Sequence, residues 1–190
     1  MKPIAKTMIC LLMVTAMPVL AWSQTDQFGA TDTVFADVAK LNDATWTVTI
    51  SYFNDQNVVG LAVPFKMDAG TNKIVADSAI YTGGRIAAAE WTYPGFRPDT
   101  AIQCVTLGMM AKIGPTKHKL TPGTGRLVTV YVSSLEGEPI ENLTIDSTQT
   151  APGNRLMTVV DRIQGTPPDT VTVELADRSF TPAWVVRYQK

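Results

Sequence analysis

The chain has 190 residues, of which 16 are basic and 17 acidic, so its net charge is −1 at pH 7. The sequence has no basic stripe that could follow a phosphate backbone, which argues against nucleic-acid binding. It also has no polybasic run of the kind that binds an anionic membrane surface.

The N-terminus has the pattern of a secretory signal peptide. Lys2 and Lys6 precede an apolar run over residues 8–20, and small residues follow at Ala21 and Ser23. A helix over that run is about 20 Å long, too short to cross a membrane, so the alternative of an uncleaved anchor is disfavoured. Cleavage after either small residue is acceptable, and we favour Ser23. We expect a secreted protein, extracellular or periplasmic, with no membrane insertion after signal cleavage.

The rest of the chain is of ordinary length for one domain. It contains a single cysteine, Cys104, so no internal disulfide can form. Cys104 lies in a strand-like run, where a small buried hydrophobe is favoured over pairing with a second chain. The expected organisation is a signal peptide over residues 1–23, a flexible leader over 24–31 and one domain over 32–190.

Apolar and polar residues alternate with a period of two. In residues 45–52, Trp46, Val48, Ile50 and Tyr52 fall on one face and hydroxyl residues fall on the other, as in a strand with one buried face. Docking would suit the hydroxyl face, but solvation is favoured. Turns rich in Gly, Pro and Asn separate short runs of this kind, which predicts a β-sandwich or barrel. Strands are expected near residues 32–39, 45–53, 58–67, 73–81, 85–92 (or a short helical turn there), 100–108, 126–132, 140–148, 156–163, 170–176 and 182–188.

No residue pattern indicates an active site. The only histidine, His118, lies between two lysines, and neither a second histidine nor enough cysteines are available for a zinc site. A serine nucleophile would need that same histidine as its base, and no nucleotide-binding glycine motif is present. Loop acids such as Asp55, Asp68 and Asp99 could still meet in space. The sequence predicts a protein that is not an enzyme, with no catalytic residue, no cofactor and no metal motif.

An aromatic cluster is the candidate binding site. Trp91, Tyr93 and Phe96 surround a Pro-Gly turn, and Arg85 and Arg97 are close to them in the sequence. Such rings near a loop can stack on a sugar or dock a protein. The alternative is that Trp91 and Tyr93 share a strand face and fill the core. The core is favoured for Trp91, and both alternatives stay open for Phe96.

Three segments together resemble the cohesin-like modules of bacterial exported proteins. They are an apolar strand with an internal proline over residues 58–67, an Asp-Ser, aromatic, Gly-Arg stretch over 77–85, and a Pro-Gly-x-Gly loop leading into an apolar strand over 120–132. The resemblance spans residues 32–188. It implies a single all-β sandwich of the jelly-roll type, with about nine strands in two antiparallel sheets. Some carbohydrate-binding modules share this fold.

The resemblance also implies a function. Cohesins bind dockerins through one sheet face, so we expect a non-catalytic module that docks a protein partner in an extracellular or cell-surface assembly. The family supplies no binding residue that can be carried over to this sequence. Two alternatives stay open, namely a polysaccharide-binding module and a structural subunit of an extracellular assembly. The expected partner is a dockerin-like protein or a polysaccharide, and not a nucleic acid.

Overall fold

The computed structural model describes residues 26–86, 91, 95–111, 118–148 and 155–189. The predicted signal peptide therefore lies outside the described residues. Within them, the chain forms thirteen β-strands and one short 3-10 helix. These elements are β1 (Thr33–Asn42), β2 (Thr45–Asn54), β3 (Val58–Asp68), β4 (Ile74–Ile80), β5 (Gly95–Asp99), β6 (Cys104–Met110), β7 (Gly123–Ser134), β8 (Thr144–Ser147), β9 (Met157–Val160), β10 (Ile163–Thr166), β11 (Asp169–Thr172), η1 (Leu175–Asp177), β12 (Ser179–Phe180) and β13 (Ala183–Tyr188).

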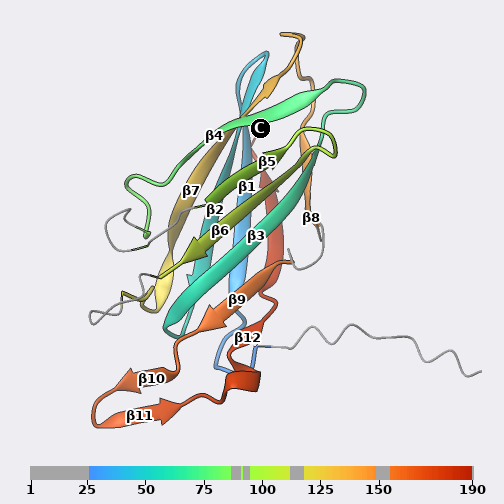
Figure 1. Cartoon of the computed structure of the whole chain (residues 1–190). Coiled ribbons are helices and arrows are strands. Elements are labelled where there is room, and N and C mark those ends of the chain that lie inside the picture. Colours follow the sequence, from blue (N-terminus) through green and yellow to red (C-terminus); the bar gives the residue numbers. More distant parts are fainter. Residues whose placement is uncertain (1–25, 87–90, 92–94, 112–117, 149–154, 190) are drawn as a thin grey trace, which may run out of the picture.

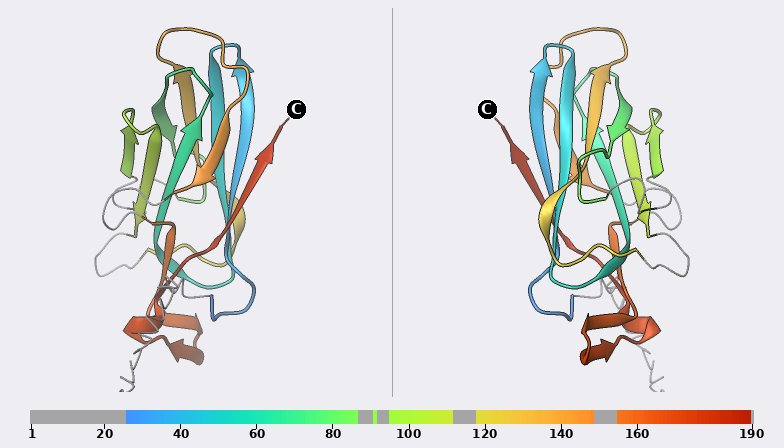
Figure 2. Two further views of the ribbon diagram at one scale, coloured as in Figure 1. Left: turned by 90° about the vertical axis from the view of Figure 1, so that its right-hand side faces the viewer. Right: turned by 90° about the vertical axis from the view of Figure 1, so that its left-hand side faces the viewer.

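Two sheets pack face to face (Figure 1, Figure 2). Sheet A has the strand order β13-β1-β2-β7-β4, and sheet B has the order β12-β9-β3-β6-β5, with β8 paired to β3. A separate β10-β11 hairpin projects from the lower end of the sandwich in Figure 1, next to η1. The predicted all-β sandwich is confirmed. Its strands exceed the predicted nine because several short segments, such as β10 and β12, pair as strands of their own.

The predicted alternation of β2 is confirmed side chain by side chain. Val48, Ile50 and Tyr52 are fully buried and Trp46 is 8% exposed, whereas the hydroxyl residues between them are half-buried on the other face. Burying one such side chain stabilises the fold by roughly 1.5–3 kcal/mol. The core lies between the two sheets and is completed from sheet B by Leu61, Val63, Phe65 and Met67 of β3 and by Val105, Leu107 and Met109 of β6.

Strand β5 is absent from the sequence prediction. Within the described residues it pairs only with β6, and it contains Pro98. Proline is tolerated on an edge strand because no ladder partner needs its missing N–H. The hydroxyl of Tyr81 donates a hydrogen bond to the Gly95 carbonyl at 3.1 Å, which ties the start of this strand to the body of the sandwich. Of the strand or short helical turn predicted over residues 85–92, the structure describes only Arg85, Ile86 and Trp91, none of which lies in a strand, and the rest of this prediction falls outside the described residues.

The Pro-Gly-x-Gly loop predicted ahead of the strand at residues 126–132 is also corrected. Gly123 and Gly125 belong to β7 and pair with Asn54 and Tyr52 of β2. Their φ angles are +149° and +152°, values that glycine adopts far more readily than other residues. The register of the ladder shifts next to these pairs, between Ile50 and Ser51 of β2. The two glycines therefore allow an irregular strand rather than a turn.

The first and last strands of the described chain lie side by side. Strand β13 runs parallel to β1, from Thr33 opposite Ala183 to Val38 opposite Tyr188, whereas the other strand pairs of the described chain are antiparallel. The described residues contain no helix with the length and apolar character needed to cross a membrane.

Candidate functional site

The outer faces of the two sheets differ in character. On sheet A, Thr49 and Thr129 lie within hydrogen-bonding distance across β2 and β7, at 3.3 Å. Arg187 donates two hydrogen bonds of 2.6 Å to Asp37, and its guanidinium lies 4.6 Å from the centre of the Phe35 ring. These polar groups therefore interact with one another, as expected of a solvated surface.

The outer face of sheet B has a floor of very small residues. Ala62 of β3 lies opposite Gly108 of β6 on one side and Met157 of β9 on the other, and Gly108 in turn lies opposite Gly95 of β5. Three adjacent strands thus contribute a single methyl group to this row. Because side chains on one sheet face normally stand side by side across the strands, their loss leaves a hollow in the surface.

Longer side chains border this hollow. Gly60 of β3 lies opposite Met110 of β6 and Val159 of β9, and Met110 is 54% exposed. On the other side, Thr106 of β6 lies opposite Arg97 of β5. The result is an apolar groove with one cationic border, which we call the sheet B groove. It is lined by Gly60, Leu61, Ala62, Gly95, Arg97, Thr106, Gly108, Met109, Met110, Met157 and Val159.

Arg97 supplies the charge at the groove. It is exposed, and none of the ion pairs among the described residues involves it. Strand β5 holds it in place at the edge of sheet B. A guanidinium in this position can form a bidentate pair of hydrogen bonds to a carboxylate that approaches the groove.

Cys104 lies at the beginning of β6, on the same sheet. It is 4% exposed, and its thiol donates a hydrogen bond to the Ile102 carbonyl at 3.4 Å. Burial raises the pKa of the thiol, which keeps it protonated and poorly reactive. The predicted burial of Cys104 is confirmed.

The structure places the predicted aromatic site residues in different environments. Trp91 is 2% exposed and belongs to the core cluster, the alternative that the sequence analysis favoured. Phe96 is half-buried and packs against the same core, on the opposite face of β5 from Arg97. Tyr93 lies outside the described residues.

Arg85, the fourth predicted site residue, binds backbone carbonyls. Its Nη1 donates to the carbonyl oxygens of Tyr52 and Gly123 at 2.8 and 3.0 Å, and its Nη2 donates to that of Thr121 at 2.7 Å. Partial burial lowers the pKa of the guanidinium, which nonetheless stays charged. A Cβ on Gly125 would lie 3.2 Å from Cδ of Arg85. Two of the segments that carry the family resemblance therefore meet here.

Sequence reasoning missed the sheet B groove because it searched for aromatic and charged residues. Gly60 and Ala62 alternate with Leu61 and Val63 along β3, so the outward face of this strand consists of the smallest residues. That alternation is visible in the sequence. Its meaning depends on Gly108 and Gly95 lying in the same row, which only strand pairing reveals.

Comparison with known proteins gives a fold. No family model matches the chain, and no curated protein matches its sequence. Among solved structures, the third cohesin of ScaC from Acetivibrio cellulolyticus, in complex with the ScaB dockerin, matches with a TM-score of 0.50 and 12% identity over 82% of this chain and 93% of that one. The seventh ScaB type I cohesin from Pseudobacteroides cellulosolvens matches with a TM-score of 0.50 and 7% identity over 84% and 88%.

This chain has a cohesin-like fold. The matched structures span most of the chain, as the three resembling segments predicted. The identities are too low to transfer any binding residue from these proteins. The candidate site of the cohesin-like module is therefore inferred from the surface of this chain alone.

Proposed function

We propose that the chain is a secreted, non-catalytic module that docks a protein partner in the sheet B groove. The observation that carries the proposal is the row of Ala62, Gly108 and Gly95, which leaves a hollow bordered by methionines. A groove with an apolar floor and a charged border is suited to a partner's protruding side chain. Flexible methionine side chains at the border can adjust to the shape of the partner.

The structural neighbours support a docking role. One of them was solved in complex with a dockerin, which is itself a protein partner. The proposed partner of this chain presents an apolar segment to the groove and a carboxylate to Arg97. Such a pairing would anchor the partner by apolar contact and set its orientation by charge.

Filling the groove tests the proposal. We expect Gly108→Leu to weaken partner binding by at least about tenfold, because the new side chain occupies the central hollow. The fold should tolerate it, since a Cβ at this position meets no atom within 4 Å; we expect a stability change within about 1 kcal/mol. Partners captured from the secreted proteins of the source organism would be measured by biolayer interferometry against wild type and variant.

Ala39→Leu is the matched control, because Ala39 is a small, half-buried residue on the outer face of sheet A. It should leave binding unchanged. Loss of binding in Ala39→Leu with full binding in Gly108→Leu would place the interface on the other sheet and contradict the proposal. Glycan arrays test the polysaccharide alternative with the same two proteins.

Charge reversal at Arg97 gives a second measurement. We expect Arg97→Glu to lower the association rate and to reduce its dependence on salt concentration, because an exposed charge at the border of an interface acts mainly on the encounter step. Lys66→Glu, another exposed cation on the outer face of β3, is the comparison and should have the smaller effect. An association rate that does not change in Arg97→Glu would show that the partner presents no carboxylate to Arg97.

A further inference from the structure

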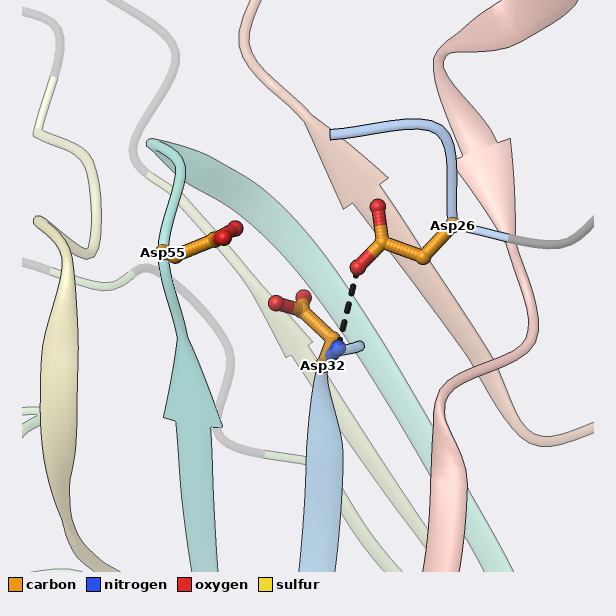
Figure 3. Close-up of side chains that lie close together, drawn as sticks. All are labelled: Asp26, Asp32 and Asp55. Atoms are coloured by element: carbon orange, nitrogen blue, oxygen red, sulfur yellow. Dashed lines mark hydrogen bonds between the residues drawn. The ribbon is translucent and has the colours of Figure 1, made fainter. Parts of the chain in front are cut away.

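Three aspartates meet at the end of the sandwich where β1 begins. Asp26 and Asp32 belong to the segment that leads into β1, and Asp55 lies in the loop between β2 and β3. Each offers a carboxylate oxygen, and these oxygens all lie within 4.8 Å of one another. Figure 3 shows the three carboxyl groups turned toward a common space.

Backbone N–H groups hold two of the carboxylates in position. The oxygens of Asp26 accept hydrogen bonds from the N–H groups of Phe28 and Asp32, at 3.0 and 2.9 Å. Oδ2 of Asp55 accepts the N–H of Ala30. Gly29 has φ +63°, and a Cβ there would collide with the Asp55 carboxylate. The segment is therefore folded closely around the acidic group of the neighbouring loop.

The buried oxygens of the cluster are not all satisfied. Asp32 is fully buried, and the Tyr52 hydroxyl donates to its Oδ2. Its Oδ1 has no hydrogen-bond partner among the described residues, and neither has the buried Oδ1 of Asp55. Buried polar atoms in native proteins are nearly always bonded to something, so these two oxygens indicate a ligand at this position.

The charge of the cluster also lacks compensation. None of the ion pairs found among the described residues includes Asp26, Asp32 or Asp55. Burial, together with the two neighbouring carboxylates, raises the pKa of Asp32 to about 7. Like charges held this close destabilise one another unless a proton or a cation joins them.

We propose that Asp26, Asp32 and Asp55 bind a calcium ion. Calcium prefers carboxylate and carbonyl oxygens at about 2.3–2.6 Å, so two oxygens on opposite sides of one ion lie up to about 5 Å apart. The carboxylate oxygens of the cluster, which all lie within 4.8 Å of one another, fit this range. An all-oxygen ligand set favours a hard divalent cation over zinc or copper.

The ion would connect two parts of the chain that are distant in sequence. It links the residues before β1 to the β2–β3 loop, through side chains whose backbone contacts already bring them together. Calcium then stabilises the folded state by mass action, because the unfolded chain has no such arrangement. This site is separate from the proposed docking function and stands or falls independently of it.

Thermal unfolding of the mature domain tests the site. The protein is treated with EDTA, dialysed and then melted in 10 mM CaCl₂ or in buffer alone. With a dissociation constant at or below about 1 mM, calcium should raise the Tm by at least about 3 °C. Terbium(III) gives a second readout, because Tyr52, which is bonded to Asp32, should sensitise its luminescence, and calcium should compete the signal away.

Asp55→Asn and the exposed Asp77→Asn form a matched pair of variants. We expect Asp55→Asn to abolish the calcium-dependent Tm shift and to weaken terbium binding at least about tenfold, while Asp77→Asn behaves as wild type. If Asp55→Asn does not fold, the calcium and terbium titrations of the wild type still decide the question. A wild-type Tm that is indifferent to calcium, or a shift that persists in Asp55→Asn, would overturn the proposal and leave proton sharing as the account of the cluster.

Discussion

Trp91→Ala should lower the free energy of unfolding by about 4 kcal/mol, the typical cost of deleting a buried tryptophan side chain. Trp91 is one of the largest fully buried side chains in the described chain, and its removal leaves a cavity that neighbouring side chains fill only in part. Domains of this size are stable by about 5–15 kcal/mol, so the variant should be marginally folded. Chemical denaturation followed by circular dichroism measures the loss.

Trp91→Phe is the companion variant, since it keeps an aromatic ring in the cavity and should cost clearly less. The pair also bears on the polysaccharide alternative. If Trp91→Ala loses glycan binding, the loss reflects unfolding of the variant. Only a loss of glycan binding in Trp91→Phe, at unchanged stability, would indicate that the tryptophan ring contacts a sugar. A Trp91→Ala protein as stable as wild type would show that the ring does not pack in the core.

Arg85→Ala should be the most destabilising change at a partly exposed position, with an expected loss of about 3 kcal/mol. Its guanidinium donates hydrogen bonds to three backbone carbonyls. They belong to two different parts of the chain, namely Tyr52 of β2 and the segment from Thr121 to Gly123. Removing the side chain leaves these carbonyls to water and opens a gap over Gly125. The measurement is the midpoint of urea unfolding at constant m-value.

Arg85→Lys separates charge from geometry. A lysine ammonium is a single point donor and cannot span carbonyls that a forked guanidinium reaches together, so this variant should recover only part of the stability. Arg97→Ala is the exposed control and should stay within about 0.5 kcal/mol of wild type. Equal stability of Arg85→Ala and Arg97→Ala would contradict the bracing role of Arg85.

The fold was predictable where one face of a strand is buried and the other faces solvent. In β2, Val48, Ile50 and Tyr52 alternate with Thr47 and Thr49, and this pattern alone specifies a strand and its inward face. The short strands β10 and β12 carry no such pattern. Strand β12 forms by pairing with β9, and β10 forms a local hairpin with β11, so strand pairing rather than an alternating pattern defines them.

Glycine explains the clearest error in the strand boundaries. The Pro-Gly-x-Gly segment has the composition of a turn, yet Gly123 and Gly125 lie in β7. The two glycines in the sequence indicate only that φ can be positive there. Arg85, some forty residues earlier in the chain, packs against them, and no local sequence pattern predicts this contact.

The candidate site was harder to predict than the fold, for a related reason. A groove made by missing side chains has no conspicuous residue, and the floor around Gly108 draws on three strands from separate parts of the sequence. The aspartate cluster shows the same difficulty. Asp55 was recognised as a loop acid that could meet others in space, but Asp26 and Asp32 join it only because the segment before β1 folds back over the β2–β3 loop.

The parallel pairing of the first and last strands has a consequence for how the protein is made. Strand β1 is complete early in synthesis, whereas its neighbour β13 begins 150 residues later, at Ala183 opposite Thr33. Until then one backbone edge of β1 stays unpaired, and an open strand edge is a template for pairing with another chain. A contact of such long sequence separation also forms slowly. Unfinished or truncated chains should therefore associate through this edge. Pairing with β13 then covers the edge in the full-length chain.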